Sequence, residues 1–504
     1  MDVAGAFAKT SHRLPEKPML VFKNKSYTFQ EMDALSDRLA GGLSSLGMRQ
    51  GDVISIGLPN GPEIIITLLA AAKLGAVVVP LNTMLKEKEL GYVFQDCPIK
   101  VAVTFRSHAE IISRLNRQGI DAPRLVVVGE GEAPDWFSYD ALTRQDSLRF
   151  AHAPMKDDDV FLIVYTSGTT GEPKGVMLTH GNVLSVARAV ASFQRQSEKD
   201  SWVCFFPLTH ITGIVNFIIG GFSTGSTMIL QERFEVNDYL ESFVLHRCSI
   251  MGAVNAVFQT ILASPKLDDS DLRSLRLITS GGASLPVELY RRLKERFRVP
   301  ILEMYGMTEN AATLTSNPLE TQKEGSVGLS LPGMEVRVED EEGRDLPVGE
   351  VGEILARGPG IMKGYYNKPD LTAKALRAGW YHTGDLGRMD EDGFLYIVDR
   401  KDDMINAGAF KIYPREIEEV LYTHPAVQDC AVKGVPDERL GQVPVAFVVV
   451  KEGQAVIREE LEALCRDRIA NYKVPRRFHF TSELPRAAQG KVMKRLLVEN
   501  FGSS

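Results

Sequence analysis

A short stretch rich in glycine and hydroxyl side chains has the composition of a polyphosphate-binding loop. The sequence YTSGTTGEPKG, residues 165–175, contains three glycines, three threonines, one serine and one lysine. Glycine leaves backbone N–H groups uncovered, hydroxyl groups add donors, and Lys174 adds a positive charge. Such donors suit phosphate oxygens. The residues expected to bind phosphate are Thr166, Ser167, Gly168, Thr169, Thr170, Gly171 and Lys174.

Two other interpretations of this loop are weaker. A solvated turn would not need so many donors between two apolar strands, which are predicted at residues 159–166 and 175–179. A Walker P-loop requires the spacing GxxxxGK[ST], which is not present in the sequence. Thr179 or Asn182 can cap a helix that follows at residues 183–193.

Helices and strands alternate through the first three hundred residues. Thr28 and Glu31 form a capping box that begins a helix, and Gly47 ends it. A strand is predicted at residues 52–58, a helix at 62–75 and a strand at 76–82, and the alternation is still present at 274–297. This rhythm predicts an α/β fold with parallel strands joined by crossover helices.

The pattern changes after about residue 320. Turn sequences such as EDEEGRDLPVGEVGE predict short strands in a β-rich subdomain. From Pro414 a helix, two strands and a further helix predict a compact α+β unit. A chain of 504 residues is too long for one hydrophobic core. We therefore predict a large N-terminal domain (residues 1–399) with parallel-rich sheets, a hinge (400–402) and a small mobile C-terminal domain (403–504).

Composition restricts the class of protein. The net charge of −7 gives no basic surface for nucleic acid. Five scattered cysteines predict neither a disulfide framework nor a zinc site and fit a reducing, cytoplasmic location. The uncharged residues 211–230 are long enough for a membrane span, but four glycines and several hydroxyl groups favour a buried helix and strand. Peripheral membrane contact stays possible in this interpretation, and the choice between monomer and homodimer is open.

Further stretches of the sequence, read together with the glycine loop, resemble the adenylate-forming superfamily of acyl-CoA synthetases, luciferases and peptide-synthetase adenylation domains. They follow in the order expected for that superfamily and cover nearly the whole chain. They are PLTHITG (207–213), SGGASLP (280–286), MYGMTE (304–309), GWYHTGDLG (379–387), DRKDDMI (399–405), PREIEEVL (414–421) and PRAAQGKV (485–492).

The resemblance implies a reaction in two halves. A carboxylate attacks the α-phosphate of ATP and gives an acyl-adenylate and pyrophosphate, and the thiol of coenzyme A then displaces AMP. Lys491 would offset charge in the first transition state, with Thr166 and His210 also in the catalytic set. Thr308 would donate to the α-phosphate, and Glu309 would hold Mg²⁺.

The same resemblance assigns binding residues. Tyr305 would stack on adenine, Asp385 and Arg400 would bind the ribose hydroxyls, and Asp402 would be the hinge residue about which the small domain rotates. The adenine and ribose set is Gly282, Ala283, Tyr305, Gly306, Asp385 and Arg400; the acyl pocket is His210, Gly213, Asn255 and Gly281; the pantetheine channel is Gly408, Ala409 and Lys411. The resemblance places His210 next to the acyl pocket in a gate or pocket role, and histidine also titrates near neutrality.

The sequence departs from the superfamily pattern at two positions. Ala409 stands where a second glycine is common, which would slow thioester formation if the residue lines the pantetheine channel. Asn255 stands where proline is frequent, and its amide is expected either to bind a loop carbonyl or to touch substrate.

The function expected from the resemblance is an AMP-forming ligase that joins a carboxylic acid to coenzyme A. The stretch ITGIVNF has no acidic residue for an amino-acid substrate, and no cation stands in it for a dicarboxylate. A medium- or long-chain fatty acid is the first expectation. An aromatic acid of the benzoate or cinnamate type is the alternative, ahead of a luciferase-like or carrier-protein-acylating enzyme. A nucleotide-binding regulator without turnover is a further alternative, but Lys491 and Glu309 are both present.

Overall fold

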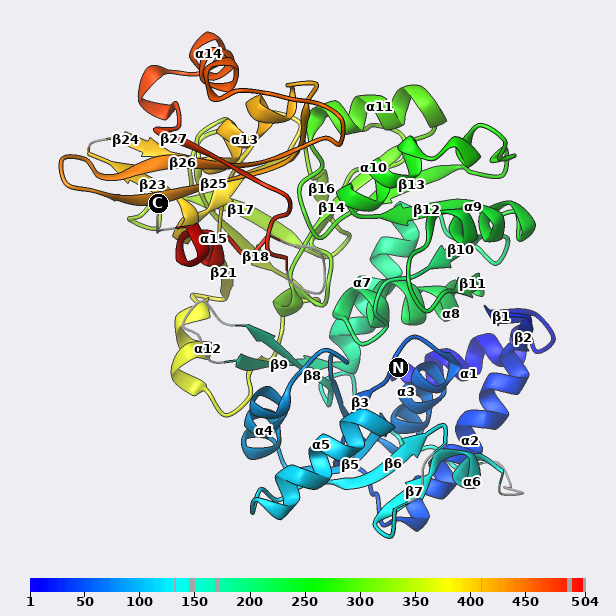
Figure 1. The fold of residues 1–504 in the computed structure, drawn as a ribbon. Coiled ribbons are helices and arrows are strands. Elements are labelled where there is room, and N and C mark those ends of the chain that lie inside the picture. The colour runs from blue at the N-terminus through cyan, green and yellow to red at the C-terminus, as the bar shows by residue number, and fades with distance from the viewer. Residues whose placement is uncertain (131–132, 145–149, 168–172, 409, 487–491, 502–504) are drawn as a thin grey trace.

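The structure, a computed structural model, describes residues 1–130, 133–144, 150–167, 173–408, 410–486 and 492–501. The chain forms a large N-terminal domain of mixed sheets and a smaller C-terminal domain (Figure 1). The fold class is therefore α/β, as predicted. The expected boundary at residues 399–403 and the hinge at Asp402 stay predictions.

The first large sheet holds the strands on both sides of the glycine-rich loop. Its strands are β3 (Val53–Gly57), β4 (Val77–Pro80), β5 (Ile99–Phe105), β6 (Arg124–Val128), β7 (Trp136–Ser138), β8 (Val160–Ser167), β9 (Pro173–Thr179) and β19 (Gly364–Tyr365). Their order is β19-β9-β8-β4-β3-β5-β6-β7. The pairing is parallel from β8 to β7, but β8 and β9 are antiparallel because the loop between them is too short for a crossover.

The second large sheet carries most of the motifs that follow the loop. Its strands are β1 (Pro18–Phe22), β2 (Lys25–Thr28), β10 (Ser201–Cys204), β11 (Thr227–Leu230), β12 (Ile250–Ala253), β13 (Leu277–Ser280), β14 (Ile301–Tyr305), β15 (Thr315–Ser316) and β16 (Leu329–Ser330). Their order is β16-β15-β14-β13-β12-β10-β11-β1-β2. The central strands are parallel, as the alternating pattern predicted, and the outermost pairs are antiparallel.

Helices cover and connect these two sheets. They are α1 (Val3–Arg13), α2 (Phe29–Ser45), α3 (Pro62–Leu74), α4 (Glu87–Asp96), α5 (Arg106–Arg117), α6 (Tyr139–Thr143), α7 (His180–Phe193), α8 (Gly220–Thr224), α9 (Val236–Leu245), α10 (Asn255–Ala263), α11 (Val287–Phe297) and α12 (Pro369–Ala375). Shorter turns are the π-helix η1 (Gly213–Ile219) and the 3₁₀ helices η2 (Pro265–Leu267), η3 (Thr308–Asn310) and η4 (Lys401–Asp403). Both predicted caps are present, since Thr28 with Glu31 and Thr179 with Asn182 form capping boxes.

The later part of the chain forms two smaller sheets. The β-rich subdomain contains β17 (Glu335–Glu339), β18 (Gly352–Arg357), β20 (Leu376–Arg377), β21 (Trp380–Met389) and β22 (Leu395–Arg400). The C-terminal domain contains β23 (Ile405–Ala407), β24 (Phe410–Ile412), β25 (Val427–Asp437), β26 (Gly441–Val450), β27 (Arg477–Thr481), α13 (Pro414–Tyr422), α14 (Arg458–Arg468), η5 (Asn471–Lys473) and α15 (Lys494–Phe501). Two core clusters in this domain involve only residues 405–497, so it has a core of its own.

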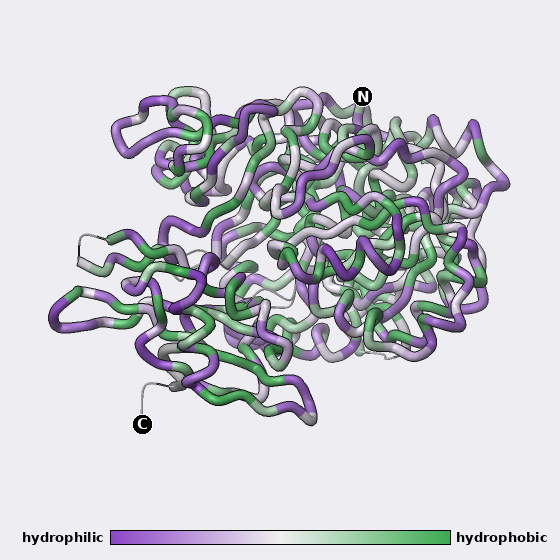
Figure 2. Tube along the Cα trace, turned by 90° about the horizontal axis from the view of Figure 1, so that it is seen from above, coloured by the Kyte–Doolittle hydropathy of each residue, from purple (hydrophilic) through white to green (hydrophobic). Residues whose placement is uncertain are grey.

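The apolar stretch at residues 211–230 is part of the interior, as expected. It forms η1, α8 and β11, and Ile218, Ile219 and Phe222 in it are completely buried. Hydrophobic segments run through the inside of the molecule, while many hydrophilic turns lie on its outline (Figure 2). In the part of the chain that the structure describes, no helix has both the length and the apolar character needed to cross a bilayer.

A buried lysine joins two helices that support the first sheet. Lys73 on α3 lies 2.6 Å from Asp33 and 2.6 Å from Asp37, both on α2, and its side chain is only 6% exposed. Removal of the ammonium group would leave two carboxylates facing each other without a cation. The interaction therefore fixes the packing of α2 on α3.

We predict that Lys73→Ala lowers the free energy of unfolding by about 2–3 kcal/mol, because breaking a buried ion pair costs more than the pair itself contributes. Thermal or urea unfolding measures the change. Lys100→Ala is the matched control, since Lys100 pairs with Asp52 at the surface and should contribute less than about 1 kcal/mol. Equal effects of the two substitutions would contradict the prediction.

Candidate functional site

One large cavity separates the two domains and has a volume of about 1900 Å³. Thr166 on β8 and Lys174 on β9 line it, and these two residues are register partners across the hairpin. Thr308, from the 3₁₀ helix η3, lines the same cavity. The structure thus brings two motifs that are more than a hundred residues apart to one opening.

A tyrosine hydroxyl connects the lysine of the loop with the glutamate of the MYGMTE motif. The Lys174 ammonium donates to Tyr365 Oη at 3.2 Å, and Tyr365 Oη donates to Glu309 Oε1 at 3.0 Å. Lys174 Nζ also lies 4.4 Å from the centroid of the Tyr365 ring. Burial, followed by the charge of Glu309, raises the pKa of Tyr365, so the hydroxyl stays protonated.

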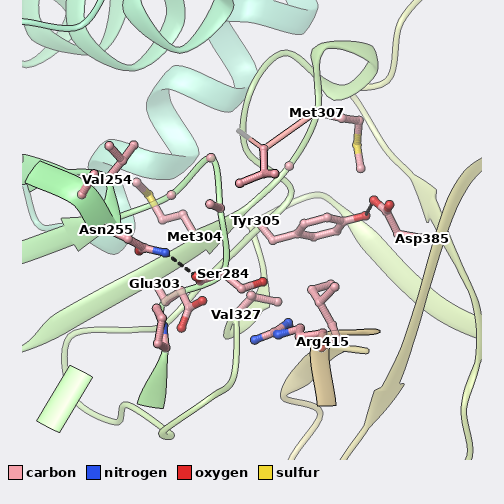
Figure 3. A pocket seen from close by; sticks show the side chains of 18 of the residues that line it. Val254, Asn255, Ser284, Glu303, Met304, Tyr305, Met307, Val327, Asp385 and Arg415 are labelled. Atoms are coloured by element: carbon pink, nitrogen blue, oxygen red, sulfur yellow. Dashed lines mark hydrogen bonds between the residues drawn. The ribbon is translucent and has the colours of Figure 1, made fainter. Parts of the chain in front are cut away.

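A second group of side chains surrounds Asp385. Tyr305 Oη donates to Asp385 Oδ2 at 2.6 Å, and Arg400 Nε lies 3.1 Å from Asp385 Oδ1 (Figure 3 shows the first contact). Asp385 and Arg400 are register partners on β21 and β22, so the sheet itself places them together. Burial raises the pKa of Tyr305 well above its ordinary value.

Two glycines of the motifs are needed for different reasons. A Cβ on Gly306 would lie 2.2 Å from the Ala312 carbonyl oxygen, because the chain returns close to this residue after η3. Gly282 has a φ of +82°, which favours glycine. At the expected adenine site, a side chain would therefore collide with backbone at Gly306 and strain the backbone at Gly282.

Three carboxylate or amide groups hold the loop that follows Gly282. Asn255 Nδ2 donates to the Ser284 carbonyl at 2.7 Å (Figure 3), and Glu303 Oε1 accepts from the Leu285 N–H at 2.9 Å. From the C-terminal domain, Glu419 Oε2 accepts from the Val287 N–H at 3.4 Å. Of the two roles expected for Asn255, the structure shows the contact with a loop carbonyl. Burial raises the pKa of Glu303 to about 7.

The structure changes the expected chemistry of His210. Burial lowers the pKa of its imidazole to about 4, so it does not titrate near neutrality as the sequence interpretation assumed. Its Nδ1 accepts from the Thr212 N–H at 3.3 Å, which assigns the proton to Nε2. His210 lines the cavity as a neutral donor and not as a cation.

An apolar arm of the cavity crosses four neighbouring strands of the second sheet. Its lining residues come from β14 (Met304), β13 (Thr279), β12 (Gly252 and Ile250) and β10 (Trp202). Three spacings between adjacent strands make this arm roughly 14 Å across.

Helix α7 and the π-helix η1 supply further lining residues of the arm. Val190 and Gln194 come from α7 and its end, and Asn216 and Phe217 come from η1. The Asn216 amide donates to Thr313 Oγ1 at 3.0 Å, which fixes η1 next to the segment between η3 and β15. Among the described residues that line this arm, none is a lysine or an arginine.

Several predicted site residues lie elsewhere or outside the described residues. Gly213 does not line the cavity: a Cβ on it would lie 2.5 Å from the Pro207 carbonyl, so it permits close packing of the chain. Gly281 and Asn255 do line the cavity, and so does Asp402 on η4. The predicted residues outside the described part are Gly168, Thr169, Thr170, Gly171, Ala409 and Lys491; for Ser167 only the backbone is described.

The C-terminal domain faces the cavity with the segment that flanks position 491. Arg486 and Val492 line the same cavity as Thr308. Of the residues expected at the pantetheine channel, Gly408 and Lys411 do not line the cavity, and Lys411 Nζ pairs with Glu341 at 2.8 Å on the β-rich subdomain. Gly408 has a φ of +64° and donates to the Leu440 carbonyl.

Sequence reasoning missed the residues that complete these groups. Tyr365 joins Lys174 and Glu309, and the motif KGYYNKP around it could have been singled out by its tyrosines and turn residues. Trp202 and Phe206 were missed because apolar residues of a strand end give no signal of their own.

Comparison with known proteins agrees with these observations. The family described as AMP-binding enzyme matches residues 7–366, and its C-terminal domain matches residues 416–491. A feruloyl-CoA synthase of Amycolatopsis sp is 37% identical over 94% of this chain and 94% of its own length. A long-chain-fatty-acid–CoA ligase of Bacillus subtilis (strain 168) is 33% identical over 97% of this chain and 92% of its own.

Solved structures of related enzymes have the same fold as this chain. ATP-bound MatB from Rhodopseudomonas palustris superimposes with a TM-score of 0.92 at 30% identity, covering 100% of this chain and 99% of its own. The apo form of MatB gives 0.81 at the same identity, covering 99% of each chain. At nearly equal identity and coverage, this chain therefore superimposes better on the ATP-bound form of MatB than on the apo form. On these matches and this site, the chain belongs to the AMP-binding enzyme family, within the adenylate-forming superfamily that includes the AMP-forming acyl-CoA ligases.

Proposed function

We propose that this chain is an AMP-forming ligase that activates an apolar carboxylic acid and transfers it to coenzyme A. The observation that carries the proposal is the meeting of two unlike surfaces in one cavity. Lys174, Thr308, Glu309 and Asp385 form a polar end, and the arm that reaches Trp202 forms an apolar end. A carboxylic acid bound in the arm presents its charged group to the polar end.

The polar end has the donors and the carboxylate that MgATP requires. ATP, Mg²⁺ and coenzyme A are the substrates and cofactor expected for this family. Among the described residues no group of three or more acidic, histidine or cysteine side chains could enclose a metal. Mg²⁺ commonly uses one or two carboxylates with phosphate and water oxygens, so Glu309 as its protein ligand fits. Bound there, the ion would offset phosphate charge.

In the first half-reaction a carboxylate oxygen attacks the α-phosphorus while the α–β phosphoanhydride bond breaks and pyrophosphate leaves. Both reactants are anions, so catalysis needs donors aimed at the developing charge. We assign this role to Thr166, Lys174, Thr308 and Lys491. His210, held neutral, donates to the acid carboxylate from Nε2. Tyr305, Asp385 and Arg400 form the proposed site for the adenine and the ribose.

The second half-reaction requires a different face of the C-terminal domain. The coenzyme A thiolate attacks the acyl carbonyl, and AMP leaves with the electron pair of the C–O bond. In the arrangement seen here Gly408 and Lys411 lie away from the cavity, so this half requires rotation about the proposed hinge at Asp402. The ion pair between Lys411 and Glu341 would break as the domain rotates.

The length of the apolar arm supports an extended acid. A span of roughly 14 Å across the four strands exceeds what a small acid such as acetate would fill. A medium- or long-chain fatty acid therefore remains the first candidate substrate. An aromatic acid is the second candidate, because Trp202 and Phe217 lie edge to face with centroids 6.2 Å apart, and Phe206 lies 5.3 Å from Phe217. Activity with acids of increasing length, and with benzoate and cinnamate, separates the two.

Gly252 lies at the middle of the arm, so a substitution there tests directly whether the acyl chain occupies the arm. A Cβ on Gly252 would lie 2.9 Å from Thr279 Oγ1 and 3.7 Å from Phe217 Cζ. We predict that Gly252→Val lowers kcat/KM for dodecanoate and hexadecanoate at least about tenfold and changes that for hexanoate much less, because a blocked pocket rejects the extra methylenes. Gly41→Ala, at an open site on α2, is the control. An equal loss for all acids would show that the acyl chain does not lie in this arm.

We predict that Lys491→Ala slows adenylation by about 10²-fold or more, which is the scale for a lost transition-state donor. Pyrophosphate release measures this half. Conversion of supplied acyl-adenylate with coenzyme A should survive, because the lysine serves only the first half. The exposed Lys199→Ala is the control. A parallel loss in both halves would refute the assignment of Lys491 to adenylation.

We predict that Glu309→Gln raises the Mg²⁺ concentration needed for half-maximal pyrophosphate release and slows adenylation, since an amide is a poorer ligand than a carboxylate for a hard cation. A titration with Mg²⁺ at fixed ATP measures the shift. Unchanged Mg²⁺ dependence would remove Glu309 from the metal site.

A further inference from the structure

We propose that Tyr365 is a positioning residue that keeps Lys174 and Glu309 apart and ready for MgATP. The inference rests on the proposed function, because it concerns the cation and the anion that would receive phosphate and metal. The Tyr365 hydroxyl stands between them as acceptor from the ammonium and donor to the carboxylate, at 3.2 Å and 3.0 Å. Among the hydrogen bonds of the described side chains, those of Tyr365 are the ones that join the two charged groups.

The arrangement has a defined direction of hydrogen bonding. An ammonium group can only donate and a carboxylate can only accept, so the phenol must accept with its oxygen and donate with its proton. Tyr365 is 4% exposed, and Lys174 lies over its ring, so the hydroxyl has little freedom to turn away.

The Tyr365 hydroxyl acts as a spacer, because without it Lys174 and Glu309 would form a direct ion pair. Opposite charges that face each other in a partly buried cleft attract strongly and would close to contact. In the part of the chain that the structure describes, Lys174 makes no ion pair within 4.0 Å. A contact pair between Lys174 and Glu309 would have to break before phosphate and metal could bind. Tyr365 replaces that strong contact with two weaker hydrogen bonds that the incoming ligands can exchange.

The backbone explains why Tyr365 can serve both partners. β19 pairs with β9, and Tyr365 lies opposite Val176, two residues after Lys174. The Met362 N–H donates to the Glu309 carbonyl at 2.8 Å, which holds η3 against the same segment. The strand pairing therefore ties Tyr365 to the lysine, and the turn before it ties it to the glutamate.

Tyr365→Phe tests the inference because it removes only the hydroxyl and keeps the ring under Lys174. Tyr396→Phe is the matched control, since Tyr396 donates to Asp390 at 3.2 Å on β22 and takes no part in the cavity. Binding of MgATP without acid is measured by calorimetry at several Mg²⁺ concentrations. Each half-reaction is measured separately, and thermal unfolding confirms that the variants are folded.

We expect Tyr365→Phe to raise the Kd for MgATP and the Mg²⁺ half-saturation about fivefold or more. Conversion of supplied acyl-adenylate with coenzyme A should stay within about twofold, because this half uses neither the β- and γ-phosphates nor their metal. Tyr396→Phe should match the wild type in every measurement. Unchanged MgATP binding in Tyr365→Phe, or an equal loss in both half-reactions, would overturn the proposal.

A double-mutant cycle separates the spacer from a simple phosphate contact. Glu309→Gln removes the anion, so no ion pair can form, and adding Tyr365→Phe should then weaken nucleotide binding by less than about twofold. Additive losses would overturn the spacer role of Tyr365, because the hydroxyl would then act on the nucleotide directly.

The same measurements separate this inference from the proposed function. Failure of the wild type to bind MgATP would overturn the proposed function as well, whereas normal binding with no effect of Tyr365→Phe would overturn this inference alone.

Discussion

One buried carboxylate connects the parts of the molecule that must act together. Asp385 receives the hydroxyl of Tyr305 from the second large sheet and the guanidinium of Arg400 from the β-rich subdomain. Arg400 is the last residue of β22 and immediately precedes η4, where the hinge is proposed. A charge that is 5% exposed needs such partners, because burial without them would cost several kcal/mol. Because Asp385 needs both partners, it fixes β14, the β-rich subdomain and the start of the proposed hinge relative to one another.

The C-terminal domain contacts the large domain through α13 and a few outer side chains. Arg415 on α13 donates from its guanidinium to the Ile397 carbonyl at 2.6 Å, and its backbone N–H donates to Asp399 at 3.0 Å. Longer contacts join Glu419 to the Val287 N–H and Gln259 to the Gln428 carbonyl, both at 3.4 Å, and Lys411 pairs with Glu341 at the surface. Long hydrogen bonds and exposed ion pairs contribute little each, so the short bonds of Arg415 are the stronger contacts. Through Glu419 the domain also holds the end of the loop after Gly282.

The two ends of the cavity illustrate opposite uses of burial. At the polar end, buried groups keep partners: Tyr305 donates to Asp385, and Tyr365 joins Lys174 to Glu309, while burial raises the pKa of both phenols. At the apolar end, burial makes His210 neutral, because no anion among its described contacts compensates the loss of solvent. A neutral imidazole can donate to a carboxylate without forming an ion pair with it.

Local features of this protein were determined by the sequence alone. The capping boxes at Thr28 and Thr179, the strands around the glycine-rich loop and the helix that begins at Pro414 depend on neighbouring residues, so their signals are present in short stretches. The order of the motifs was enough to indicate the family. The sequence also singled out Asn255 as a departure from the superfamily pattern, but it did not identify the Ser284 carbonyl as its partner.

Only the tertiary structure decided which distant side chains meet. Tyr365 is 191 residues from Lys174, and no local pattern marks it as the neighbour of both that lysine and Glu309. The low pKa of His210 arises from its burial, and the apolar arm of the cavity is formed where α7, η1 and the second sheet meet. Gly213 has a packing role because the chain returns to Pro207 there. These properties depend on the packing of whole elements against each other, which the sequence encodes only through the complete fold.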